Sequence, residues 1–160
     1  MKRPAMAVLL CASLLAGCSA TARLYPVQGP LSQQNPAPVF VGRMKAGLHS
    51  GNFNVVLDNG ETGKGRWTLV PRPSGPANAA IPASPSTGTM ASEWDLVYGQ
   101  GFYVAHVLGS RQYARVEITG TRGSVLHAEL YEPDNTEQQT LASIKGVAKD
   151  DKGNIYKIAF

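Results

Sequence analysis

The stretch QYARVEITGTRGSVLHAELYE, residues 112–132, decides the fold class of this chain. Apolar and polar residues alternate on both sides of Thr121-Arg122-Gly123, as in two strands that each bury one face and solvate the other. A turn at this tripeptide places Gly123 where the backbone needs a positive φ. The apolar face of the resulting hairpin pairs Ile118 with Leu126, Val116 with Ala128 and Ala114 with Leu130.

The polar face of the same hairpin supports this register. It pairs Glu117 with His127 and Arg115 with Glu129. Opposite charges directly across an antiparallel pair are favourable, and a slip of one residue would move every side chain to the other face. Because the apolar residues alone set the register, the complementary charges are independent support for the hairpin.

Alternation predicts further strands on both sides of this hairpin. One hairpin turns at Asn59-Gly60, and another turns at residues 150–153 between segments 141–148 and 154–160. A separate strand is expected at residues 38–44. The residues expected to face the core are Phe53, Val55, Leu57, Trp67, Leu69, Tyr156, Ile158 and Phe160.

Two segments near the middle of the chain are assigned from other signals. Residues 102–108 (FYVAHVL) are apolar on both faces, which is typical of a central strand covered on both sides. Residues 92–95 (SEWD) match a helix capping box, so residues 93–98 are predicted to form a short helix, with a short strand as the alternative.

These elements predict an all-β fold with at most one short helix. Seven to nine short strands at near-regular spacing indicate a small antiparallel meander, either closed into a barrel or folded as a sandwich. The length of 160 residues allows a single ordinary domain. Residues 71–92 contain five prolines and few large side chains, so they are expected to be a mobile loop within that domain.

Composition excludes several classes of function. The formal net charge is only +4, and the basic residues are scattered rather than clustered, so no nucleic-acid partner is expected. No apolar run long enough for a membrane-spanning helix follows the N-terminus. The chain has no HExxH, CxxC or paired-histidine spacing, and therefore neither a metal site nor a cofactor is predicted.

The N-terminus has the organisation of an export signal. A cationic start precedes the apolar run AMAVLLCASLL, residues 5–15, which is too short to span a bilayer. The next residues, Leu15-Ala16-Gly17-Cys18, resemble the lipobox of bacterial lipoproteins. The alternative is an ordinary secretory signal that is cut elsewhere, with Cys18 in the discarded piece.

The lipobox resemblance implies a division of the chain. Residues 1–17 would be a signal peptide, and Cys18 would become the acylated first residue and the membrane anchor. Residues 18–37 are expected to be a flexible tether, and residues 38–160 the β-domain. Because Ser19 rather than Asp follows the cysteine, the resemblance also implies the outer membrane of a diderm bacterium, with the domain facing the periplasm.

A second resemblance covers about half of the chain. Residues 146–157 and 94–108 are similar to segments of small uncharacterised lipoproteins of Gram-negative bacteria. That group brings no known activity, so Cys18 is the only residue to which the resemblance assigns a role.

The aromatic segment WDLVYGQGFY, residues 94–103, and the histidines are the remaining candidates. The rings either seal one end of the β-domain or form a binding surface. His49 is expected in an exposed turn, whereas His106 is either a core histidine or a proton-transfer group. The predicted binding surface consists of Trp94, Tyr98, Tyr103 and His106.

Three functional hypotheses follow. The first is a non-catalytic, lipid-anchored β-domain that binds an envelope protein or a glycan or supports envelope architecture. The second is an envelope hydrolase that uses His106 with Asp95. The third is a periplasmic inhibitor of a wall-degrading enzyme, similar in size and β content to lysozyme-inhibitor lipoproteins. Those proteins usually keep a disulfide, which this chain could not form, because Cys11 would leave with the signal peptide and Cys18 would be acylated.

Overall fold

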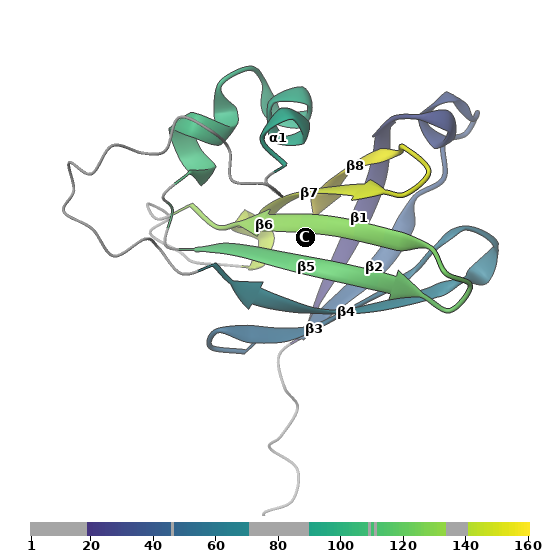
Figure 1. Cartoon of the computed structure of the whole chain (residues 1–160), viewed down its shortest axis with the longest axis horizontal. Helices are drawn as coiled ribbons and strands as arrows, with labels where there is room; N and C mark the ends of the chain where they lie inside the picture. Colours follow the sequence, from purple (N-terminus) through teal and green to yellow (C-terminus); the bar gives the residue numbers. More distant parts are fainter. Residues whose placement is uncertain (1–18, 46, 71–89, 109, 111, 134–140) are drawn as a thin grey trace, which may run out of the picture.

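A computed structural model describes residues 19–45, 47–70, 90–108, 110, 112–133 and 141–160. They form a closed barrel in which each strand pairs antiparallel with the next and the first pairs with the last (Figure 1). The strands are β1 Ser19–Gln28, β2 Phe40–Lys45, β3 Ser50–Val56, β4 Thr62–Leu69, β5 Tyr113–Gly120, β6 Val125–Tyr131, β7 Lys145–Asp150 and β8 Ile155–Ala159. The predicted all-β meander is therefore confirmed, and it is a barrel rather than a sandwich.

The remaining described elements are short and helical. The helix α1, Ala91–Tyr98, leads into a π-helical turn at Tyr103–Val107. Single 3-10 turns occur at Pro30–Gln33, Asp58–Gly60 and Leu141–Ser143. The helix confirms the expectation for residues 93–98, but the capping box is wrong, because Met90 is the N-cap and the Ser92 hydroxyl donates to the Glu93 carboxylate instead.

The central hairpin has the predicted register at every pair. β5 and β6 pair Ile118 with Leu126, Val116 with Ala128, Ala114 with Leu130, Glu117 with His127 and Arg115 with Glu129. Gly123 has the positive φ that the turn requires. The His127 Nδ1 and Glu117 Oε2 atoms lie 3.6 Å apart on an exposed face. The alternation of apolar and polar residues was therefore sufficient to fix this part of the barrel.

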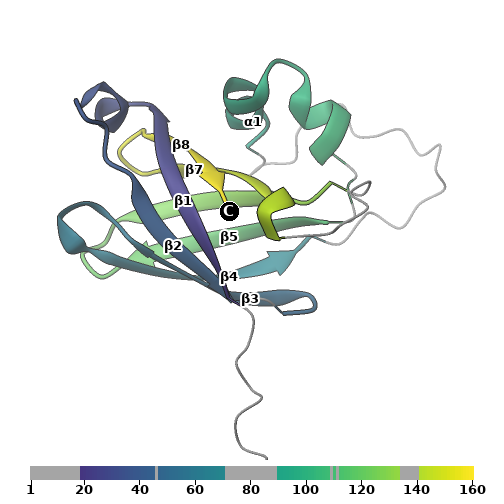
Figure 2. The ribbon, with the colours of Figure 1, turned by 180° about the vertical axis from the view of Figure 1, so that it is seen from behind.

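The predicted tether is wrong over residues 19–28, which form β1. Ala20, Ala22 and Leu24 point into the barrel, and the intervening residues point outward. β1 lies between β8 and β2, as Figure 2 shows, and it closes the barrel. Two of the three inward residues are alanines, so the strand carries a weak apolar pattern. Cys18 lies outside the described residues and immediately precedes this strand.

The predicted central strand at residues 102–108 is also wrong, because this segment is helical. The Leu108 amide donates to the Tyr103 carbonyl across a π-helical turn. Tyr103 and Val107, four residues apart, are both buried, whereas His106 is exposed. A short apolar run fits a strand and a buried helical turn equally well. Of the predicted mobile loop, residues 71–89 lie outside the described residues, and residues 91–92 belong to α1.

The core has two parts. Side chains from the strands fill the barrel interior, where small residues make room for large ones. For example, a Cβ at Gly42 would lie 2.9 Å from the Phe53 ring. The second part lies outside the barrel, where α1 and the π-helical turn cover the flank formed by β6, β7 and β8. Its buried members are Met90, Trp94, Tyr103, Val107, Tyr113, Tyr131 and Val147.

Two carboxylates hold α1 against this flank. Glu129, on the outer face of β6, is 1% exposed and accepts hydrogen bonds from the Met90 amide, the Trp94 indole and Arg115. Glu93 accepts one from Lys149 at 2.9 Å. Burial raises the pKa of Glu93, but the hydrogen bonds from Lys149 and Ser92 outweigh burial and leave that pKa below its ordinary value. The flank is therefore an internal surface of the molecule.

Candidate binding site

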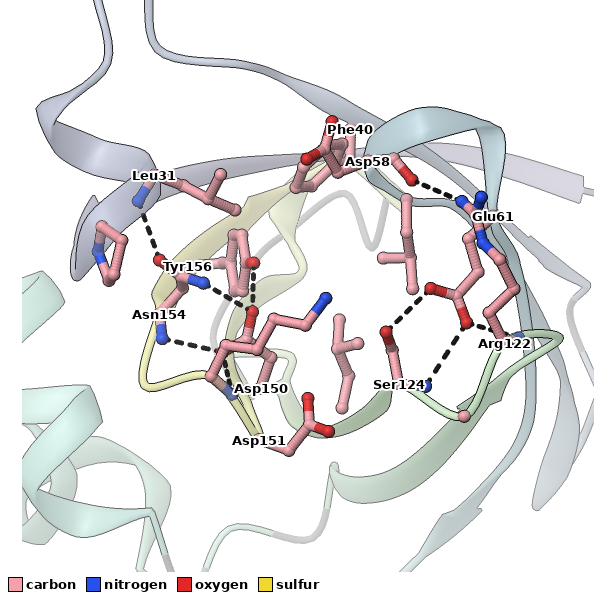
Figure 3. Close-up of a pocket in the computed structure, with 15 residues that line it drawn as sticks. Leu31, Phe40, Asp58, Glu61, Arg122, Ser124, Asp150, Asp151, Asn154 and Tyr156 are labelled. Carbon is pink, nitrogen blue, oxygen red and sulfur yellow. Dashed lines mark hydrogen bonds between the residues drawn. The ribbon is translucent and has the colours of Figure 1, made fainter.

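The two ends of the barrel differ in chemistry. We call the end that carries the β1–β2, β3–β4, β5–β6 and β7–β8 connections the polar end; the arrowhead of β5 points toward it in Figure 1. A cavity of about 450 Å³ opens there, which we call the cup. The residues around it, shown in Figure 3, include Leu31, Phe40, Asp58, Glu61, Arg122, Ser124, Asp150, Asp151, Asn154 and Tyr156.

Glu61 braces one side of the cup. Its carboxylate accepts hydrogen bonds from the backbone amides of Arg122, at 2.8 Å, and Ser124, at 3.3 Å, and from the Ser124 hydroxyl, at 2.7 Å. The hydrogen bonds from the Ser124 hydroxyl and the Arg122 amide lower the pKa of Glu61 below its ordinary value. Gly120 leaves the space for this carboxylate, since a Cβ there would collide with the Glu61 side chain. The β3–β4 and β5–β6 connections are thereby joined.

Asp150 braces the opposite side. One carboxylate oxygen accepts from the amides of Lys152 and Asn154, and the other accepts from the Asn154 side-chain amide and the Tyr156 hydroxyl, both at 2.7 Å. Asn154 in turn accepts a hydrogen bond from the Leu31 amide at 2.9 Å. Burial, followed by the hydrogen bond to Asp150, raises the pKa of Tyr156, so its hydroxyl stays protonated and continues to donate. The β7–β8 turn is thus fixed to the β1–β2 connection.

The cup combines an apolar floor with an acceptor-rich wall. Phe40, Leu57 and Leu126 supply apolar surface, and all three are buried residues of the barrel core. Four carboxylates line the cup, namely Asp58, Glu61, Asp150 and Asp151, against two cations, Arg122 and Lys152. A ligand that presents hydrogen-bond donors and an apolar face would match this lining. Because the walls are held by their own hydrogen bonds, the cavity exists before any ligand enters.

The residues predicted as a binding surface lie on the flank, away from the cup. Trp94 is 0% exposed and Tyr103 is 5% exposed, so neither ring is available to a partner. Tyr98 is half-buried, and its hydroxyl contacts the Gly146 carbonyl. His106 is exposed, and its ring is tilted against that of Phe102 with 4.6 Å between the ring centroids. The rings also do not seal an end of the barrel, since they cover its side.

The predicted acid–base pair is not formed. The Asp95 carboxylate accepts a hydrogen bond from the Tyr103 amide at 3.0 Å and so links α1 to the π-helical turn. Within the described part of the chain, no hydrogen bond or ion pair joins His106 to Asp95. His49 lies in an exposed bend, as expected. The described residues contain no group of three or more His, Cys, Asp or Glu side chains that could hold a metal ion.

The sequence pattern alone does not mark four residues of the cup as site residues, namely Glu61, Asp150, Asn154 and Tyr156. Each lies at an inward position near a strand end, where the alternation predicts an apolar side chain or a turn. Glu61 and Asp150 are polar residues on an apolar face, and that conflict was the available signal.

No family model, no curated protein and no solved structure matches this chain. In the part of the chain that the structure describes, no helix has the length and apolar character needed to cross a bilayer.

Proposed function

We propose that this chain is a lipid-anchored, non-catalytic binding protein of the bacterial envelope. In this proposal Cys18 is acylated and holds the barrel at the periplasmic side of the outer membrane. The lipobox supports the location, because an apolar run, two small residues and a cysteine occur in the order that lipoprotein processing requires. More than one acyl chain makes such an anchor stable.

The braced cup is the observation that carries the binding role. Asp150 accepts four hydrogen bonds and Glu61 accepts three, all from residues of the cup wall and its turns. Buried carboxylates are costly unless their hydrogen bonds are satisfied, so a folding role alone would be met more simply by apolar residues. Their presence around an open cavity favours a recognition site.

We assign a glycan as the ligand class. A sugar ring carries hydroxyl donors at its edge and an apolar C–H face. The cup offers the exposed carboxylates of Asp58 and Asp151 at its rim and Phe40 and leucine side chains at its floor, while Glu61 and Asp150 hold the wall in shape. Asp151 is exposed at the rim and can accept from a ligand hydroxyl. The volume of about 450 Å³ accommodates a compact ligand rather than a folded partner.

Titration calorimetry of the detergent-solubilised lipoprotein with soluble cell-wall glycan fragments tests this function. We expect binding, and we expect Asp151→Asn to weaken it about tenfold, because one charge-assisted hydrogen bond is lost. Glu117→Gln, which changes an exposed carboxylate on the outer face of β5, is the matched control and should bind like the unmodified protein. A diamine is a cationic ligand that the carboxylates alone would attract, so binding of a diamine but of no glycan would refute the ligand class. Equal binding of the glycan by Asp151→Asn and Glu117→Gln would refute the cup as the site.

A further inference from the structure

The end of the barrel opposite the cup is apolar. We call it the apolar end; it carries the β2–β3, β4–β5 and β6–β7 connections and the first residue of β1. A hollow of about 150 Å³ lies there, and Met44, Leu48, Trp67, Leu69, Leu130 and Ile144 line most of it. Leu48, in the β2–β3 connection, is 91% exposed, the largest exposed fraction among the exposed large apolar residues that the structure describes. The barrel is therefore polarised along its length.

The chain enters the barrel at this apolar end. Ser19, the first residue of β1, pairs with Lys45, the last residue of β2, and the connection that carries Leu48 follows directly. Cys18 precedes Ser19, and consecutive Cα atoms are only about 3.8 Å apart. Because β1 occupies the segment expected to be a tether, no flexible spacer separates Cys18 from the barrel.

The charges at this end suit a lipid headgroup layer. Lys45 is exposed at the end of β2. Lys145, at the start of β7, is half-buried, and its Nζ lies 5.4 Å from the centroid of the Phe102 ring and 5.8 Å from that of the Tyr98 ring on the flank. Among the described residues that line the apolar hollow, Glu132 is the acidic one, whereas four described carboxylates line the cup at the other end. An anionic membrane surface attracts juxtamembrane basic residues, so the apolar end is the one that a bilayer favours.

We propose that the apolar end rests on the lipid surface, with Leu48 among the headgroups, and that the cup opens away from the membrane into the periplasm. This inference rests on the proposed function, since it requires acylation of Cys18. Entry of the exposed Leu48 side chain into the interface would remove apolar surface from water, while the nearby Lys45 would meet anionic headgroups. The acylated Cys18 and Leu48 then both contact the membrane from the apolar end. The barrel therefore keeps one orientation relative to the membrane, whereas a flexible tether would let it rotate freely.

Fluorophore labelling tests the orientation. Leu48→Cys and, as the matched control, Lys152→Cys at the exposed rim of the cup are each labelled with a polarity-sensitive dye. The lipoprotein is reconstituted into vesicles of phosphatidylethanolamine and phosphatidylglycerol that contain a headgroup nitroxide. We expect the label at residue 48 to emit at shorter wavelength and to be quenched at least threefold more strongly than the label at residue 152.

The outcomes separate the two proposals. If the protein floats with the vesicles but both labels are quenched equally, or the label at residue 152 is quenched more, the orientation is overturned and the anchor stands. If the protein does not float, both proposals are overturned. His49→Cys, at a neighbouring exposed position, repeats the measurement without removing Leu48 and must give the same ranking.

Discussion

The buried carboxylate of Glu129 links α1 to the barrel, because it accepts hydrogen bonds from the Met90 amide, the Trp94 indole and Arg115. Glu129 pairs with Arg115 on the polar face of the hairpin, as predicted. That face was expected to be solvated, yet Glu129 is 1% exposed because α1 covers it. The alternation of apolar and polar residues within a hairpin shows which way a side chain points. Whether water reaches that side chain depends on elements outside the hairpin, here α1.

Replacement of Glu129 tests how much this buried carboxylate contributes. Glu129→Ala leaves the Trp94 indole and the Met90 amide without the carboxylate that accepts their hydrogen bonds, so we expect the free energy of unfolding to fall by about 2–4 kcal/mol. Urea denaturation measures the loss, and Trp94 fluorescence reports the loosening of α1. Glu117→Ala, on the exposed face of the neighbouring strand, should change stability by less than about 0.5 kcal/mol. Equal losses of unfolding free energy in Glu129→Ala and Glu117→Ala would contradict the conclusion that Glu129 holds α1 against the barrel.

At the scale of elements, the strands with large apolar residues and glycine turns were predictable, and two segments were not. β1 was missed because its inward side chains are mostly alanine, and because it contains Pro26 and Gln28, residue types that are common in linkers. Its partner β2 follows only after the connection at residues 29–39, and its other partner, β8, lies near the C-terminal end of the chain, so no tight-turn signal marks β1. The segment 102–108 was misassigned because apolar residues on all sides fit a helical turn as well as a strand.

The connections at the polar end carry a pH-dependent contribution to stability. The pKa of Glu61 is lowered in the folded state, so its contribution is present above its ordinary pKa, near 4.5, and is lost as the pH falls through the lowered value. We therefore expect the difference in free energy of unfolding between the unmodified protein and Glu61→Gln to shrink from pH 6 to pH 3. Ser124→Ala removes the strongest hydrogen bond to this carboxylate and should reduce the difference in part. A difference that is constant across this range would rule out Glu61 as the source.

For the whole molecule, the strand count and the meander followed from the sequence, but closure did not. A barrel and a sandwich share the same local alternation, and they differ in whether the first strand reaches the last. Here β1 pairs with both β2 and β8, which closes the sheet and leaves none of its eight strands at an edge. The cup was likewise unforeseen, because connections that are distant in sequence meet only when the barrel closes.

We propose a closed barrel that begins at the residue after an acylated cysteine. Mass spectrometry of the mature N-terminal peptide, from protein isolated with the membranes of a diderm bacterium that expresses the full chain, tests it most directly. We expect the first residue to be Cys18 and to carry an S-diacylglyceryl group and an N-linked acyl chain. A mature chain that begins at any other residue, or a Cys18 without lipid, would contradict it.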